Sequence, residues 1–126
     1  MAKYVDGFVL VVPKNKVAEY TKMADEGKQM WMKHGALEYM ECMGEDLVPK
    51  AMDDMKPLAF TKMAKARPGE TVWFSFIVYK SKKHRDEVTK KVMDEMNEKY
   101  KDKKDFAMPF DMKRMAYGGF EVVVEG

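Results

Sequence analysis

The 126-residue sequence lacks most of the features that assign a protein directly to a functional class. Cys42 is its single cysteine, so an intrachain disulfide cannot form. His34 and His84 are its two histidines, and together with one cysteine they give no dense set of metal ligands. No apolar run approaches the roughly 18 residues of a membrane-spanning helix. We therefore expect neither a disulfide, nor a metal site, nor a membrane partner.

An excess of charge of one sign is also missing. The 23 basic and 21 acidic residues leave a net charge of +2, and the two signs alternate along the chain, as in residues 99–105. Nucleic acid attracts a one-sided basic surface, so we expect no nucleic-acid partner. The first residues lead straight into an apolar run at Tyr4, without the regions of a secretory signal. A cytoplasmic location is therefore expected.

Cofactor motifs are absent as well. The sequence has no phosphate-binding loop, dinucleotide fingerprint, nucleophile elbow or zinc-protease motif, so it predicts no cofactor. Methionine, in contrast, is abundant. Its 14 residues are spread along the chain, which favours gap filling in a core or interface over a soft-metal site.

What the sequence does contain is a regular alternation of strand-like and helix-like segments. Two helices are predicted, one over 16–33 from apolar residues that recur every three or four positions, and one over 82–100 that Ser81 caps. Residues 44–56 are polar and irregular, and 58–65 fit either a short strand or a helical turn. Strands are predicted from runs rich in β-branched and aromatic residues at 4–12, 36–43, 71–79 and 116–124.

This order of elements predicts one α+β domain that spans residues 1–126. Two β-α-β halves of this size make a ferredoxin-like βαββαβ fold, whose antiparallel sheet carries both helices on one face. Within the strand at 36–43, Glu38 and Glu41 point to opposite faces. No linker or internal repeat divides the chain.

Both faces of the predicted sheet are apolar, although two helices can cover only one. One side, which we term the Val-Phe face, is purely apolar, and we expect it to meet the helices: Val5, Gly7, Val9, Val11, Val72, Phe74, Phe76 and Val78. The other side, which we term the mixed face, also carries polar and aromatic groups: Asp6, Phe8, Leu10, Val12, Trp73, Ser75, Ile77 and Tyr79.

If the mixed face lacked a cover, it would expose a large apolar patch, which usually marks an interface. A second copy of the chain is the simplest cover, so we expect a homodimer joined through sheet faces. The mixed face inside such a dimeric α/β barrel is where a small-molecule cavity is expected.

Two polar clusters are candidates for chemistry. His84 and Arg85 open the second helix, where His84 could serve as acid or base and Arg85 could hold an anion, helped by the helix N-terminus. The alternative is an ordinary charged first turn.

The second cluster contains Asp111, Lys113 and Arg114, with Arg114 as a carboxylate clamp. The alternative is structural: Asp111 caps a turn, and Arg114 pairs with Asp6 or Glu121 across strands. The catalytic candidates are His84, Asp111 and Arg114. The candidate pocket residues are Asp6, Trp73, Ser75, Tyr79, Arg85, Tyr117 and Glu121.

Several segments resemble one family. The most specific are Met-Pro-Phe-Asp at 108–111 and Gly-Gly-Phe-Glu at 118–121; weaker matches are Tyr-Val-Asp-Gly-Phe at 4–8, His-Gly-Ala-Leu-Glu at 34–38 and the strand at 72–79. Together they are similar to the YbaA-like family of bacterial domains of unknown function, over nearly the full length. The chain departs from that pattern at Met112, where a small Gly is common, and it matches least over 48–63.

The resemblance implies the dimeric α/β barrel superfamily and no assigned activity. By analogy of fold, it suggests a homodimeric small-molecule enzyme of the cofactor-independent monooxygenase or isomerase kind. One alternative is a non-catalytic metabolite-binding or stress-related dimer, and another is a purely structural dimer whose barrel is filled by side chains.

Overall fold

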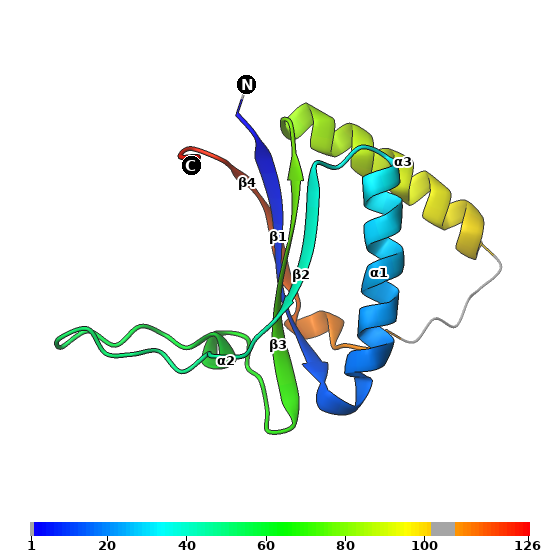
Figure 1. The fold of residues 1–126 in the computed structure, drawn as a ribbon. Coiled ribbons are helices and arrows are strands. Elements are labelled where there is room, and N and C mark those ends of the chain that lie inside the picture. The colour runs from blue at the N-terminus through cyan, green and yellow to red at the C-terminus, as the bar shows by residue number, and fades with distance from the viewer. Residues whose placement is uncertain (1, 102–107) are drawn as a thin grey trace.

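Four antiparallel strands form one open sheet, and two long helices cover one of its faces (Figure 1). The computed structural model describes residues 2–101 and 108–126. The strands are β1 (Tyr4–Pro13), β2 (Glu38–Met43), β3 (Glu70–Tyr79) and β4 (Ala116–Glu121). The helices are α1 (Val17–Lys33), α2 (Phe60–Met63) and α3 (Lys82–Tyr100), with 3-10 turns η1 (Lys14–Lys16) and η2 (Met112–Arg114). Neighbouring strands follow the order β2-β3-β1-β4.

The predicted α+β class and antiparallel sheet are confirmed. α3 occupies the predicted residues, and α1 begins one residue later than predicted. Between β2 and β3, α2 is a helical turn, which decides the alternative left open for residues 58–65. β4 ends at Glu121 and is therefore shorter than the predicted strand at 116–124.

Local chemistry explains where α1 ends and where α3 begins. The backbone of Gly35 has a φ of +113°, which side chains other than glycine rarely adopt, and it follows the last turn of α1. Ser81 caps α3, since its Oγ accepts a 3.1 Å hydrogen bond from the backbone N–H of His84. Among the residues of the described chain, no helix is long and apolar enough to cross a membrane.

The strand register brings distant residues into one row. β1 pairs with β3 from Tyr4 opposite Tyr79 to Pro13 opposite Glu70. In this register Phe8 lies opposite Ser75, and Ser75 in turn lies opposite Glu41 of β2. Residues directly opposite each other point to the same face. Phe8, Ser75 and Glu41 therefore lie side by side across the sheet.

The helices cover the mixed face, so two predictions are wrong: that the helices cover the Val-Phe face, and that a second copy of the chain covers the mixed face. Leu10, Trp73 and Tyr79 are at most 5% exposed. They pack in clusters with buried residues of α1 and α3 such as Tyr20 and Val88.

The reason is that polar groups on the mixed face have bonding partners within the chain. Arg85 binds Asp6, Glu41 accepts from Ser75, and Trp31 donates to Tyr79. A polar group that is hydrogen-bonded can be buried at little cost.

One end of the Val-Phe face is covered by residues that follow α2. There Val11 and Val72 pack against Ala64, just after α2. Elsewhere on this face Phe74 of β3 is 46% exposed, and Phe120 of β4, which lies opposite Val5, is 61% exposed.

Residues 44–59, which we term the arm, extend from the end of β2 away from the helix-covered side (Figure 1). The arm turns back on itself at Met52 and Met55, which exchange two backbone hydrogen bonds of 2.8 and 2.9 Å. Its apolar side chains are strongly exposed, namely Val48, Met52, Met55 and Leu58.

Candidate functional site

A cavity of about 480 Å³ lies between the long helices and the mixed face. Its wall is mostly apolar and combines aromatic, methionine and aliphatic side chains: Phe8, Met30, Trp31, Ile77, Met96 and Phe110. Pockets of this size and character hold small molecules in other proteins. We term it the helix-sheet cavity.

Glu41 is the centre of a polar cluster in this cavity. Its Oε1 accepts a 2.7 Å hydrogen bond from the Tyr20 hydroxyl and a further one from Ser75 Oγ. Its Oε2 accepts a 2.7 Å hydrogen bond from the Tyr39 hydroxyl. All four residues line the helix-sheet cavity. A carboxylate only accepts hydrogen bonds, so three converging hydroxyl donors suit its ionised form.

Each member of the cluster comes from a position that the fold fixes. Ser75 and Glu41 are paired across β3 and β2, and Tyr39 lies two residues before Glu41 on the same face. Tyr20 comes from the first turns of α1, on the apolar stripe that faces the sheet. The cluster therefore joins two strands and one helix.

The two tyrosines of the cluster are held as neutral donors. Burial, and after it the charge of Glu41, raises the pKa of Tyr20 and of Tyr39 well above the usual range of tyrosine. Both phenols thus keep their protons at any physiological pH. Both hydroxyls orient the Glu41 carboxylate by donating to it.

Of the predicted pocket residues, Ser75 lines the helix-sheet cavity. Trp73 lies beside it, with its ring at 4.8 Å and edge-on to Tyr20, and its indole N–H donates to Thr71. Tyr117 stacks on Phe8 with the ring centroids 5.6 Å apart, and its side chain is 70% exposed. Glu121 is exposed near the end of β4.

Asp6, Tyr79 and Arg85 lie at the other end of the mixed face. The Arg85 guanidinium donates to Asp6 at 2.7 Å and to Asp86 at 2.8 Å, and it lies over the ring of Tyr4 at 4.8 Å. Burial raises the pKa of the Tyr79 hydroxyl, and the charge of Asp6 adds to this effect. Arg85 is therefore occupied by carboxylates of the chain itself.

His84 makes its hydrogen bonds to residues at the start of its own helix, α3. Its Nδ1 accepts a 3.0 Å hydrogen bond from the Lys80 backbone N–H, and its own backbone N–H donates to Ser81. Its ring also lies edge-on to Tyr79, with the centroids 6.1 Å apart. It does not belong to the wall of the helix-sheet cavity.

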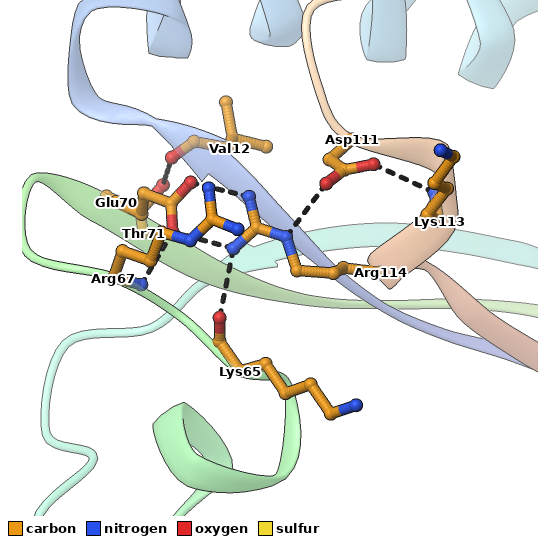
Figure 2. A network of polar contacts seen from close by, with 8 residues as sticks. All are labelled: Val12, Lys65, Arg67, Glu70, Thr71, Asp111, Lys113 and Arg114. Carbon is orange, nitrogen blue, oxygen red and sulfur yellow. Dashed lines mark hydrogen bonds and ion pairs between the residues drawn. The ribbon is translucent and has the colours of Figure 1, made fainter.

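Arg114 is the centre of a second polar network (Figure 2). Its guanidinium forms a bidentate pair with Glu70, with both N–O distances at 2.7 Å. It also donates to Asp111 at 2.9 Å and to the Lys65 carbonyl at 3.0 Å. The predicted pairing with Asp6 or Glu121 is wrong, because β4 begins after Arg114 and the side chain lies at the opposite end of β1.

The carboxylates in the Arg114 network are strongly stabilised as anions. Hydrogen bonds from Arg114 lower the pKa of Glu70 to about 2 and also lower that of Asp111. Asp111 caps η2 by accepting a 2.9 Å hydrogen bond from the Lys113 N–H. This network ties the start of β3 to the turn before β4, and its residues are not in the cavity wall.

Sequence reasoning missed Glu41, Tyr20 and Tyr39. One signal was present: Glu41 is a charged residue within a strand, on the face opposite Glu38. The structure puts Glu41 on the helix-covered side, where a buried carboxylate needs donors. Within the described part of the chain, no group of three or more His, Cys, Asp or Glu is placed to hold a metal ion.

Comparisons with known proteins give relatives but no activity. Residues 3–112 match the model of a family described as "Protein of unknown function (DUF1428)". The chain is 42% identical over 125 residues to "Uncharacterized protein YbaA" of Escherichia coli strain K12, and equally to that of Shigella flexneri, covering 98% of each chain. Among solved structures it is similar to "De novo designed protein Foldit4", with a TM-score of 0.41, 10% identity, and coverage of 98% of this chain and 99% of that one.

Proposed function

The chain belongs to the DUF1428 family, whose description states no function, and we propose from its own site that it binds a small molecule in the helix-sheet cavity. The observation that carries this proposal is the Glu41 cluster within an apolar cavity of about 480 Å³. Ligand sites typically combine such a volume and apolar wall with a few fixed polar groups that orient the ligand.

Binding without catalysis is the activity that the geometry favours. Three hydroxyl donors engage the carboxylate oxygens of Glu41 within the chain, and burial keeps the two phenols protonated. The catalytic candidates His84, Asp111 and Arg114 are bound to other groups outside the cavity wall. We therefore propose a metabolite-binding protein.

An enzyme of the cofactor-independent monooxygenase or isomerase kind is the second candidate. The observation in its favour is the same carboxylate in an apolar cavity, which could take a proton from an enolisable compound. Turnover of a bound compound by the wild-type protein, lost in Glu41→Gln, would favour this second candidate over simple binding.

A thermal-shift screen against a metabolite library tests the binding proposal. A ligand present at a hundred times its Kd should stabilise the folded chain by roughly 2.7 kcal/mol. Ala24→Leu puts a larger side chain into the cavity wall and should abolish that shift. Ala18→Leu, which makes the same change on the exposed side of α1, should leave it intact. If both variants keep the wild-type shift, the ligand binds elsewhere and the proposal is contradicted.

We also propose that two copies pair through their Val-Phe faces. The supporting observation is that this face, which the helices leave uncovered, carries exposed Phe74, Phe120 and Met40. The strand order β2-β3-β1-β4 with both helices on one side is that expected of a ferredoxin-like half of a dimeric α/β barrel. Covering these side chains would contribute several kcal/mol at about 25 cal/mol per Å².

The arm supports the same pairing. It extends on the uncovered side of the sheet, and its exposed apolar side chains need a cover as well (Figure 1). In a two-fold pair, each arm would lie beside the partner's sheet. The arms would then enlarge an interface that must reach about 800 Å² on each partner to be stable.

A further inference from the structure

Glu41 differs from the other carboxylates that are buried or half-buried on the sheet. Asp6 is paired with Arg85 and Glu70 with Arg114, each at 2.7 Å. Glu41 accepts its hydrogen bonds from three neutral hydroxyls, and no ion pair joins it to any Lys, Arg or His of residues 2–101 and 108–126. Its negative charge is therefore bound but not neutralised there.

An anion without a cation in an apolar site attracts a cation. Interactions between charges strengthen as the surroundings become less polar, and the wall of the helix-sheet cavity is mostly apolar. Tyr20 and Tyr39 do not neutralise this charge by transferring a proton to the carboxylate, since burial raises the pKa of both hydroxyls. A cationic ligand group would thus gain more here than at an exposed carboxylate such as Glu45.

The cavity wall also suits an organic cation. Trp31 and Tyr39 lie with their ring centroids 6.3 Å apart, and Tyr20 and Phe110 lie edge-on to each other at 5.7 Å. Aromatic faces attract ammonium and guanidinium groups, most strongly where water is excluded. Met30 and Met96 are in the same wall and offer flexible, polarisable contacts to an apolar ligand body.

We propose that the ligand of the helix-sheet cavity is an organic amine or guanidine with an apolar body. The cationic group lies against Glu41, and the body lies along the aromatic and methionine wall. This inference rests on the proposed binding function and specifies its ligand class. A neutral hydrogen-bond donor and an organic anion are the competing classes, and the experiment below separates them.

The test compares three probes of one shape: naphthylmethylamine, naphthylmethanol and naphthoate. Isothermal titration calorimetry with the wild-type chain at neutral pH should give the amine an affinity roughly tenfold or more above the alcohol, which corresponds to about 1.4 kcal/mol. Both probes can donate a hydrogen bond to the carboxylate, but only the ammonium adds an attraction between opposite charges. The carboxylate should bind most weakly, because Glu41 repels it. This ranking requires no variant.

Glu41→Gln then removes the charge and retains the shape. Its affinity for the amine should fall roughly tenfold or more, while that for the alcohol changes less than about threefold. Glu45→Gln makes the same change in net charge on an exposed loop residue and should leave the amine affinity unchanged. The affinity for the alcohol shows whether the variant cavity is intact.

Each result decides one proposal. If the alcohol binds the wild type as tightly as the amine, or if Glu41→Gln leaves the amine affinity unchanged, the cationic ligand class is wrong while the binding function stands. If none of the three probes binds but the metabolite screen gives a shift that Ala24→Leu abolishes, the ligand class is wrong and the binding function stands. If neither experiment detects binding, both proposals fail.

Discussion

Asp6, Glu41 and Glu70 each lose water on folding, and each is compensated by donors from another element. Arginine provides them for Asp6 and Glu70, and hydroxyl groups provide them for Glu41. An unpaired buried carboxylate would cost several kcal/mol. Asp6 and Glu41 can therefore lie on the mixed face beneath the helices, whereas Glu70 lies at the start of β3 on the Val-Phe side.

Tyr20→Phe tests the hydroxyl cluster at this scale. The change removes the 2.7 Å hydrogen bond to Glu41 from a side chain that is 4% exposed, and it leaves the ring in place. We expect the free energy of unfolding to fall by about 1–2 kcal/mol in urea denaturation. Tyr117→Phe, at a side chain 70% exposed, should change it by less than about 0.5 kcal/mol. Equal losses in both variants would contradict a special role for the Glu41 contact.

The Arg114 network predicts a pH dependence of stability. The folded pKa of Glu70 is about 2, below its ordinary 4.5, so the folded state binds fewer protons than the unfolded state between these values. The stabilisation by Glu70 is thus fully present above pH 4.5 and is lost as the pH falls toward 2. Arg114→Gln should lower the free energy of unfolding at neutral pH and should flatten its decline in that acidic range.

Urea denaturation at several pH values measures both slopes. Lys22→Gln removes one positive charge from the exposed surface of α1 and should retain the wild-type decline. A variant of Arg114 with the wild-type slope would show that Glu70 is not the group responsible.

At the scale of elements, local signals were sufficient for the helices and most of the sheet. α3 was predicted at the observed residues because Ser81 and the apolar period mark both its start and its extent. The sequence predicts only an irregular segment at the arm, because the turn that Met52 and Met55 close has no local signature in those two residues. Asp53 within this turn has a φ of 55°, a conformation that asparagine and aspartate tolerate better than most residues.

Ser81→Ala tests the start of α3. It deletes the acceptor for the His84 N–H at a residue that is 8% exposed. The free energy of unfolding should fall by about 1 kcal/mol, whereas Ser81→Gly should cost only a few tenths. Thermal denaturation followed by circular dichroism would show the difference. A change in Ser81→Ala no larger than that in Ser81→Gly would mean that the cap contributes little.

At the scale of the whole molecule, the sequence could not decide which face the helices cover. Both faces are apolar, and the purely apolar one was assigned to the helices. Long-range contacts reversed this: Arg85 reaches Asp6, and Tyr20 reaches Glu41, over wide separations in sequence. The observed cavity borders the mixed face, but it lies between this face and the helices of one chain, and the predicted cavity inside a dimeric barrel stays a prediction. Glu41 is not predicted as a site residue, because only the pairing of β2 with β3 brings it next to Ser75.

The proposed dimer makes a prediction at this scale. Met40 on β2 is 48% exposed on the uncovered side of the sheet, and Met32 on α1 is 42% exposed on the helical side. Met40→Glu would place a charge in the proposed interface, where burial of an unpaired carboxylate is costly. Met32→Glu makes the same substitution at similar exposure, outside that interface.

Sedimentation equilibrium at micromolar concentration measures the outcome. We expect a dimer for the wild type and for Met32→Glu, and a monomer or a dimer weakened roughly tenfold or more for Met40→Glu, since several kcal/mol of apolar burial are at stake. A wild-type monomer would overturn the pairing outright. A dimer that Met40→Glu leaves intact but Met32→Glu breaks would mean that the copies associate through the helices, and the apolar arm and sheet would then need another cover.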